Sequence, residues 1–288
     1  IGNNAFEKIT TLKIIEWKNI ASIGINSFKE CSGIKSLSIP VQVTTMGISS
    51  FEGCSGITSL SIGNGITEIT ENGFKGCTSI ETLTIPDQVT TIGKQSFSDC
   101  EKIKTITFGT ENRKLNKISE EAFLNCKALE SIIIPKSVET IESNAFTSTG
   151  LKTVEYQGET NPFTGTAFDK TSLKFANVPI KYSDVKFCEL TAISKGECGT
   201  GCKWEYKHES KELIITGEGD NAEIENYPRT SDSKESPWSD KKGTITTISI
   251  TGITRIGNQA FKGCTSFATI TLPESVKTIG QNSFEGCS

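Results

Sequence analysis

The sequence predicts a repeat solenoid built around a parallel β-sheet, and two observations support this fold class. Phenylalanine returns at intervals of 22, 23, 23, 23, 26 and 23 residues, and the series is Phe6, Phe28, Phe51, Phe74, Phe97, Phe123 and Phe146, resumed by Phe261 and Phe284. Each of these residues also stands in one frame, I-x-x-x-[ASG]-F-x-x-C-x-x-[IL]-x-x-[IL]-x-[IL]-[PG]-x-x-[VI]-x-x-I. Self-similarity at such a period is typical of solenoids, in which each repeat forms one coil.

The second half of the frame predicts one short strand per coil. Ile34, Leu37 and Ile39 have the spacing that turns the first, fourth and sixth residues inward. Pro40 ends the strand because proline cannot donate to a ladder, and Gly63 at the same position permits a turn. We therefore expect the strands of successive coils to pair in parallel, about 4.8 Å apart.

The remaining frame positions predict an opposite wall and the filling between the two walls. Val43 with Met46, and Val89 with Ile92, supply apolar residues for that wall. Phenylalanine, preceded by a small residue, fills the space between the walls. Short helical or irregular segments complete each coil, and no single coil can bury its own core, so neighbouring coils must do so.

Ten cysteines divide into two groups. Seven occupy one frame position, three residues after the phenylalanine, and their periodicity predicts buried free thiols; they are Cys31, Cys54, Cys77, Cys100, Cys126, Cys264 and Cys287. Thr149 fills the same position in one coil. A buried thiol acts as a small hydrophobe with a weak donor that can satisfy loop backbone. Cys188, Cys198 and Cys202 lie outside this series and are the plausible disulfide formers, with their pairing left open.

The repeats predict three segments. Residues 1–190 form a first tract that ends in a degenerate coil with Phe168 displaced, and such decay is typical of a terminal cap. Residues 191–244 form a hairpin and loop insert, in which "KWEYKH" and "ELIITG" read as two strands with apolar residues at Trp204, Tyr206, Leu213 and Ile215. Residues 245–288 begin a second tract, which we expect the hairpin to cap; the alternative is that the hairpin is a separate binding module.

The frame resembles the short leucine-rich repeat of BspA-like surface proteins, the treponemal class. Residues 1–179 and 245–288 match it, and the segment with Cys198, Gly199, Trp204 and Pro237 is similar to one that precedes such tracts. The extra Cys202 departs from that pattern. The resemblance implies an adhesin or surface antigen, at the cell surface or secreted, that binds a host or microbial protein or glycoprotein. It also implies no enzymatic activity.

Composition agrees with a binding or structural role. A hydrophobic fraction of 35% suits a thin core, and a net charge of −4 with dispersed signs argues against nucleic acid as a partner. No apolar run approaches the roughly 20 residues that span a bilayer. The chain starts inside a repeat and stops at Ser288 without finishing one, so we expect a piece of a longer protein. The alternative function is a structural coat or spacer without a specific ligand.

Catalytic, cofactor and metal signals are weak. His208 is the only histidine, and a solvated side chain is the simplest interpretation of its lysine- and glutamate-flanked setting. The spacing of Cys198 and Cys202 with one histidine lacks a fourth zinc ligand. "GEGDNAEIEN" lacks the GK[ST] ending of a phosphate loop. We therefore predict neither an enzyme nor a bound cofactor or metal.

One position breaks the outward row of strand residues and predicts a ligand site. The residue between the two inward strand positions is a serine or threonine in four successive coils, at Ser38, Ser61, Thr84 and Thr107, but becomes Ile133 and then Glu155. Beside Ile133 we expect Glu130, Lys152, Glu155 and Tyr156, with Arg113 and Lys114 added from a longer coil. An exposed apolar residue ringed by charge is typical of a small interface. An isolated exposed isoleucine is the competing interpretation.

Overall fold

The computed structural model of the protein forms two compact units. The first contains residues 1–174 and 187–190, and the second contains residues 175–186 and 191–288. The structure describes residues 1–109, 114–162, 166–179, 181–184, 186–187, 190–228, 233–267 and 270–287. Arg113 and Cys188, which the sequence singles out, lie outside these described residues.

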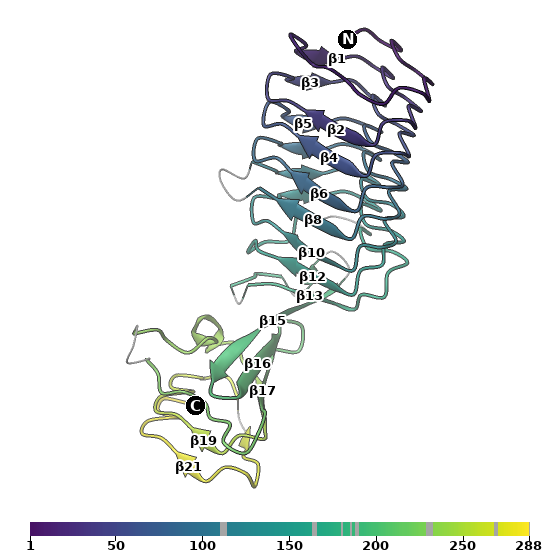
Figure 1. Ribbon diagram of the computed structural model, residues 1–288. Helices are drawn as coiled ribbons and strands as arrows, with labels where there is room; N and C mark the ends of the chain where they lie inside the picture. Colours follow the sequence, from purple (N-terminus) through teal and green to yellow (C-terminus); the bar gives the residue numbers. More distant parts are fainter. Residues whose placement is uncertain are drawn as a thin grey trace. The chain divides into compact units, whose positions relative to one another are not determined.

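The first unit is a β-solenoid with the predicted strand in successive coils. These strands lie one below another in Figure 1 and comprise β2 (Ser36–Ile39), β4 (Ser59–Ile62), β6 (Thr82–Ile85), β8 (Thr105–Phe108), β10 (Ser131–Ile134) and β12 (Thr153–Tyr156). Strand β2 pairs in parallel with β4, β6 with β8, and β10 with β12, each at equal frame positions. In β2 the inward residues Leu37 and Ile39 are buried and the two serines are exposed, as predicted.

The opposite wall is a second row of two-residue strands. It comprises β1 (Ser22–Ile23), β3 (Thr45–Met46), β5 (Glu68–Ile69), β7 (Thr91–Ile92), β9 (Lys117–Ile118) and β11 (Thr140–Ile141). Strands β5, β7, β9 and β11 form one parallel sheet, and β1 pairs with β3. Val43, Ile92 and Val138 are fully buried, so the predicted wall residues face the core.

Phenylalanine rings stack along the unit between the two walls. The stack runs through Phe6, Phe28, Phe51, Phe74, Phe97, Phe123, Phe146 and Phe168, with ring centroids 5.1–5.6 Å apart and planes within 10°. Phe168, which the sequence places out of line, still stacks on Phe146 at 5.1 Å. The degenerate coil therefore keeps its ring in the core.

Turns connect the two walls around each phenylalanine. The described residues of this unit contain no helix. The second residue before the phenylalanine and the second residue after it have left-handed backbone. Beside Phe74, these are Asn72 with φ 54° and Gly76 with φ 70°. Glycine and asparagine adopt that region most easily. Successive turns also bond to each other, because the Phe74 N–H donates to the Ser96 carbonyl at 2.8 Å.

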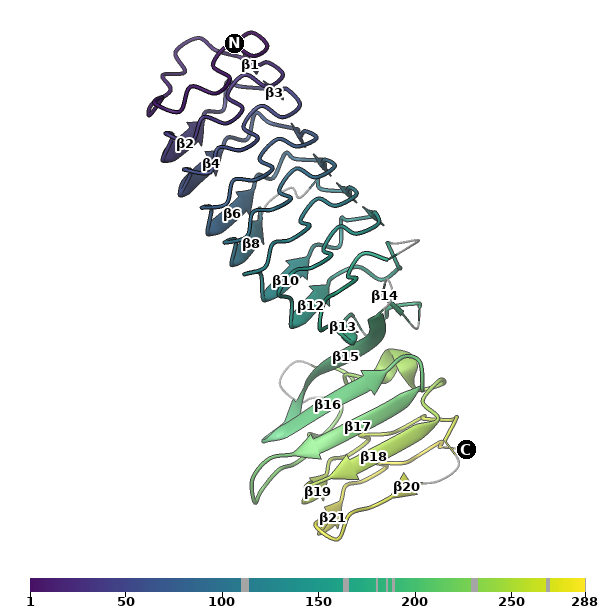
Figure 2. The ribbon, with the colours of Figure 1, turned by 90° about the vertical axis from the view of Figure 1, so that its right-hand side faces the viewer.

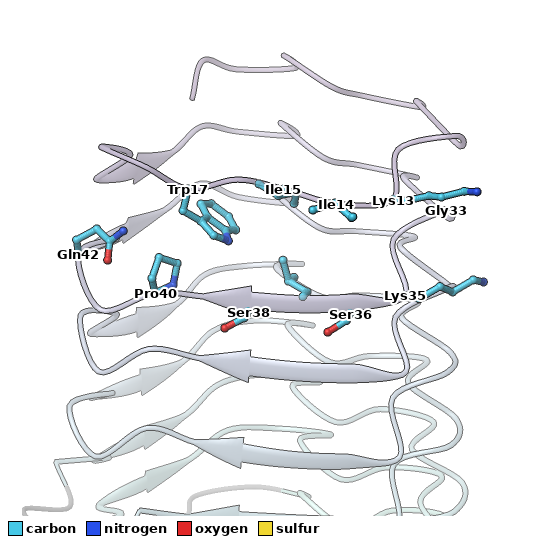
Figure 3. A pocket seen from close by; sticks show the side chains of 11 residues that line it. Lys13, Ile14, Ile15, Trp17, Gly33, Lys35, Ser36, Ser38, Pro40 and Gln42 are labelled. Atoms are coloured by element: carbon cyan, nitrogen blue, oxygen red, sulfur yellow. The ribbon is translucent and has the colours of Figure 1, made fainter.

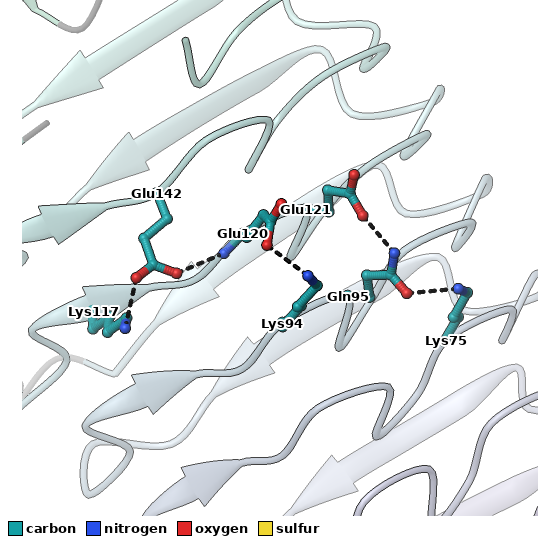
Figure 4. A network of polar contacts seen from close by, with 7 residues as sticks. All are labelled: Lys75, Lys94, Gln95, Lys117, Glu120, Glu121 and Glu142. Carbon is teal, nitrogen blue, oxygen red and sulfur yellow. Dashed lines mark hydrogen bonds and ion pairs between the residues drawn. The ribbon is translucent and has the colours of Figure 1, made fainter. Parts of the chain in front are cut away.

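Polar side chains add contacts between the coils outside the core. Lys94 pairs with Glu120 at 2.6 Å and Lys117 pairs with Glu142 at 2.7 Å, while Glu142 also accepts from the Glu120 backbone N–H at 3.0 Å (Figure 4). The hydrogen bond from Lys94 to Glu120 raises the pKa of the lysine. Exposed pairs of this kind contribute little to stability, so they mainly favour the correct alignment of neighbouring coils.

The cysteine series consists of buried free thiols, as predicted. All seven are unpaired, and six are buried, with Cys287 half-buried. Each thiol of this series in the first unit donates to the phenylalanine carbonyl of the preceding coil, as Cys54 does to Phe28 at 3.0 Å and Cys77 to Phe51 at 3.3 Å. Thr149 instead donates to Phe146 of its own coil at 2.9 Å. Burial raises the pKa of Cys54 and Cys100 to about 12.

The second unit contains the predicted hairpin, formed by β16 (Cys202–Lys207) and β17 (Glu212–Gly217) in antiparallel pairing. Its apolar residues Trp204, Tyr206, Leu213 and Ile215 are buried. Strand β15 (Leu190–Gly199) pairs antiparallel with β16 and parallel with β13 (Phe175–Asn177). On the other side, β17 pairs in parallel with β18 (Thr247–Thr251), beside it in Figure 2, and β18 with β20 (Ile270–Thr271).

The remaining elements of the chain are short. They are β14 (Lys186–Phe187), the 3₁₀ turn η1 (Ser239–Lys241), β19 (Arg255–Ile256) and β21 (Thr278–Ile279). A disulfide joins Cys198 to Cys202, which settles the partner that the sequence leaves open for these two residues.

A tryptophan takes the phenylalanine position in the first repeat of the second unit. Trp238 precedes Phe261 by 23 residues, stacks on its ring at 5.4 Å and is fully buried. Its indole N–H donates to the Ala260 carbonyl at 3.0 Å, which satisfies the one polar atom that a phenylalanine lacks. The sequence predicts Trp238 only as an apolar anchor, because phenylalanine alone defines the repeat series.

Replacing a ring in mid-stack tests the register. Phe74 is fully buried, so Phe74→Ala should cost about 3 to 5 kcal/mol through lost transfer energy and a cavity between two rings. The midpoint of urea unfolding, followed by far-ultraviolet circular dichroism, should fall accordingly. Phe175→Ala is the matched control, since that side chain is 50% exposed. Equal midpoints for the two variants would contradict the assigned register.

Thiol titration tests the cysteine series. In a Cys188→Ser background, the buried thiols should stay unreactive toward a disulfide reagent at pH 8 until denaturant is added, because burial raises their pKa. Cys287, half-buried, should react first. Mass spectrometry that found a Cys54–Cys77 disulfide, or another between adjacent coils, would exclude the free-thiol assignment.

Candidate binding surface

The strands of the first unit present a row of hydroxyl side chains on their outward side. In β2 and β4, Ser36 pairs with Ser59 and Ser38 with Ser61. The hydroxyls of Thr84 and Thr107 lie 3.0 Å apart on β6 and β8. These side chains stand side by side on neighbouring coils and are exposed, so the row forms a regular polar surface.

Ile133 interrupts this row on β10 and is 52% exposed. It lies directly opposite Glu155 on β12, so an apolar and an acidic side chain stand where the earlier strands place two hydroxyls. Glu130 and Lys152 form an ion pair at 2.6 Å at the start of the same two strands, and both are mostly exposed. We call Ile133, Glu155, Glu130 and Lys152 the Ile133 patch.

Tyr156, which the sequence places beside Ile133 on the surface, is instead a core residue. It follows Glu155 on β12 and therefore points to the other side of the sheet, where it is only 2% exposed. Its hydroxyl donates to the Val138 carbonyl at 3.0 Å, and its ring stacks on Phe187 at 4.9 Å. The strand period of two explains the correction.

Lys114 lies at a different place from the patch. Its side chain is exposed, and its ammonium group donates to the Gln88 Oε1 at 2.7 Å, on the preceding coil. It lines a small crevice with Pro86, Phe108 and Pro135, beyond the ends of the strands. The described contacts therefore do not bring Lys114 to Ile133.

Sequence reasoning missed a groove in the first unit. A volume of about 780 Å³ opens beside β2 and residues 13–17, with Ile14, Trp17 and Leu37 among its lining residues. Its signal was present, because Leu12, Ile15 and Trp17 have the spacing of Ile34, Leu37 and Ile39. A tryptophan thus stands at a position where the next coils have isoleucine.

A second hollow, of about 650 Å³, lies in the second unit over β15, β16 and β17. Charges of both signs line it: Lys195 is opposite Glu205 in the sheet, Glu197 is opposite Lys203, and Lys203 pairs with Glu218 at 2.8 Å. Because the charges are mixed and partly paired, the hollow favours no single class of charged ligand.

His208 is buried, which corrects the expectation of a solvated side chain. It is 5% exposed, its Nε2 lies 2.8 Å from the Ser194 hydroxyl, and the Tyr182 and Tyr206 rings pack edge-on against it. Burial, and next the charge of Lys241, lower the pKa of His208 to about 4. The lysine and glutamate neighbours of His208 suggest a solvated side chain. However, the even-numbered residues of β16 point inward, and His208 continues that alternation directly after the strand.

The histidine and serine pair is placed for packing. Ser194 is 1% exposed and donates its hydroxyl to the Val178 carbonyl at 2.7 Å, so neither its oxygen nor its proton faces solvent. Among the described residues, no group of three histidine, cysteine or acidic side chains could hold a metal ion. In that same part of the chain, no helix is long and apolar enough to cross a membrane.

The repeat geometry finds its counterpart in a known family. The family described as "BspA type Leucine rich repeat region (6 copies)" matches residues 1–113, 67–189 and 240–288. The chain belongs to the BspA-type leucine-rich repeat family. No curated protein matches the chain.

Several solved structures of bacterial proteins are similar to the chain. A leucine-rich repeat protein of Bacteroides ovatus is 23% identical with a TM-score of 0.47, covering 100% of this chain and 73% of its own. A leucine-rich cell surface protein of Faecalibacterium prausnitzii is 20% identical with a TM-score of 0.43, covering 100% and 74%. The pneumococcal vaccine antigen PcpA is 20% identical with a TM-score of 0.41, covering 88% and 60%.

The buried histidine predicts a pH dependence of stability. Its pKa is about 4 in the fold and about 6.5 when unfolded, so the unfolded chain binds the extra proton. His208 therefore contributes stability that is complete above pH 6.5 and is lost as the pH falls toward 4. Unfolding followed by tryptophan fluorescence should show this loss for the parent, because Trp204 and Trp238 lie in the second unit.

His208→Gln provides the control for carboxylates that titrate in the same range. The variant should be less stable than the parent at pH 7, because it disturbs a buried, hydrogen-bonded position. Its midpoint should change less than that of the parent between pH 6.5 and 4. Parallel pH profiles would contradict the burial of a neutral histidine.

Proposed function

We propose that the protein is a surface-displayed binding protein of the adhesin or surface antigen type. In this proposal the outward strand surface of the first unit recognises a host or microbial protein or glycoprotein. Membership of the BspA-type repeat family supports a binding role. The proposal also places the protein at the cell surface or in the secreted fraction, without enzymatic activity.

The observation that carries the proposal is the Ile133 patch. A side chain that is 52% exposed interrupts a regular row of hydroxyls, and Glu155 stands directly opposite it. The ion pair of Glu130 with Lys152 flanks both residues at 2.6 Å. An apolar centre with a polar rim has the composition of a small protein interface, and central residues carry a large share of binding energy.

A coat or spacer function is the second candidate. The regular serine and threonine row from β2 to β8 favours it, because small hydroxyl side chains that pair across strands, as Thr84 and Thr107 do, suit stacking without a ligand. The two candidates differ at one position. A spacer needs no exposed isoleucine, whereas an interface loses its centre when that side chain is replaced.

The test uses the immobilised chain and surface-labelled host and bacterial extracts. A captured partner should bind Ile133→Thr more than tenfold more weakly than the parent, since truncating a central contact costs about 2 kcal/mol or more. Threonine restores the local pattern and suits a strand, so unfolding should change little. Glu155→Lys should lower affinity mainly at low salt, because exposed charges are screened.

Ser61→Thr is the matched control, since it changes an outward residue of β4 away from the patch. It should bind like the parent. If no partner binds the folded chain better than the denatured chain, the spacer function would be favoured. Binding unaffected by both patch variants, but abolished by deletion of residues 196–244 with the first unit intact, would place recognition in the second unit.

A further inference from the structure

The groove beside β2 belongs to the first unit alone and is separate from the Ile133 patch. It lies between residues 13–17 and β2, with a volume of about 780 Å³. Ile14, Trp17 and Leu37 are among its apolar lining residues, and Lys13 and Lys35 among its polar ones. Figure 3 shows the extended segment on one side of the groove and the strand on the other.

The backbone of β2 has no strand partner on the groove side, because among the described strands β2 pairs only with β4. In two of the later coils the equivalent N–H group is bonded: Ser59 donates to the Lys35 carbonyl and Thr153 donates to the Glu130 carbonyl, both at 3.3 Å. The equivalent donor on β2 is Ser36, and no described residue accepts from it. In a parallel sheet the N–H and C=O of one residue face the same neighbour, so Ser36 and Ser38 present an open strand edge.

Trp17 explains why residues 13–17 stand away from β2. It occupies the inward position that Ile39 holds in the next coil, and it packs edge-on against the Phe28 ring at 6.3 Å. An indole needs more width than an isoleucine side chain. The segment therefore stands away from β2, and no backbone hydrogen bond joins its described residues to that strand (Figure 3).

The side chains give the groove a direction. Its centre is apolar, with Ile14 77% exposed and Leu37 below it. Lys13 and Lys35 extend from adjacent coils at one end, whereas Trp17, Pro40 and Gln42 lie at the other (Figure 3). Neither lysine forms an ion pair with any described residue. The groove thus combines an unpaired strand edge, an apolar floor and two unneutralised cations.

We propose that this groove binds an extended peptide segment of a partner protein as a strand added to β2. The occupant donates and accepts backbone hydrogen bonds at Ser36 and Ser38, and it buries apolar side chains against Ile14 and Trp17. It carries a carboxylate beside Lys13 and Lys35. Addition of a strand to an exposed edge takes affinity from the backbone and specificity from the side chains that flank it.

The experiment measures peptide binding by fluorescence anisotropy with the whole 288-residue chain. The probe is a fluorescein-labelled six-residue peptide of alternating valine and threonine with aspartate at one end, made in both orientations. Lysine replaces aspartate in the comparison peptides. One aspartate orientation should bind at least tenfold more tightly than its lysine counterpart, since opposite charges meet only in the former.

Two variants separate the backbone from the charges. Ser36→Pro removes the open N–H without touching the ladder to β4, and proline is tolerated on an edge, so binding should fall about tenfold while the unfolding midpoint is retained. Lys13→Glu with Lys35→Glu should reverse the preference toward the lysine peptide. Lys136→Glu, a change at an exposed lysine outside the groove, is the control and should leave binding unchanged.

Three results would overturn the proposal. The first is equal affinity for the aspartate and lysine peptides in both orientations. The second is unchanged binding by Ser36→Pro in a variant that keeps the parent's unfolding midpoint. The third is a dimer in sedimentation velocity that Ser36→Pro abolishes, because the occupant would then be a second copy of this chain. None of these results depends on the Ile133 patch, whose partner is sought separately.

Discussion

The stacked phenylalanine rings are the constraint on which the first unit depends. Their centroids lie 5.1–5.6 Å apart, slightly more than the roughly 4.8 Å between paired strands, so each ring must be offset from the next. The core of each coil is one phenylalanine ring thick, and the apolar residues of both walls pack against that ring. The small residue before each phenylalanine and the left-handed turns around it follow from that geometry. The coil between Phe97 and Phe123 is three residues longer than its neighbours, yet these two rings still stack at 5.6 Å.

The sequence predicts this architecture well because every coil repeats the same physical demands. Inward strand residues, the opposite wall and the free thiols could all be read from periodicity, and the structure places Leu37, Ile92 and Cys54 as expected. Prediction from periodicity fails where a different residue type, or an irregularly spaced one, fills the same core position. Trp238 continues the ring series of the second unit, and Phe168 stays in the first stack despite its irregular spacing.

The surface was harder to predict, since core packing does not restrict the outward positions to one type of residue. Tyr156 illustrates this difficulty, because the residue next to an outward glutamate on a strand must face inward. His208 also reads as polar in sequence, yet the strand alternation and Ser194 hold it in the core. The groove beside β2 depends on the width of one indole against Phe28, a three-dimensional relation that no single repeat discloses.

The thiol series has a consequence for the order of events when the chain first folds. Each cysteine is protected only after the coil before it supplies the phenylalanine carbonyl and the coil after it covers the sulfur. In an oxidising compartment, nascent thiols would compete with Cys198 and Cys202 for oxidant. In such a compartment each coil would have to close faster than its thiol is oxidised, and a slow repeat would expose its neighbours to cross-linking.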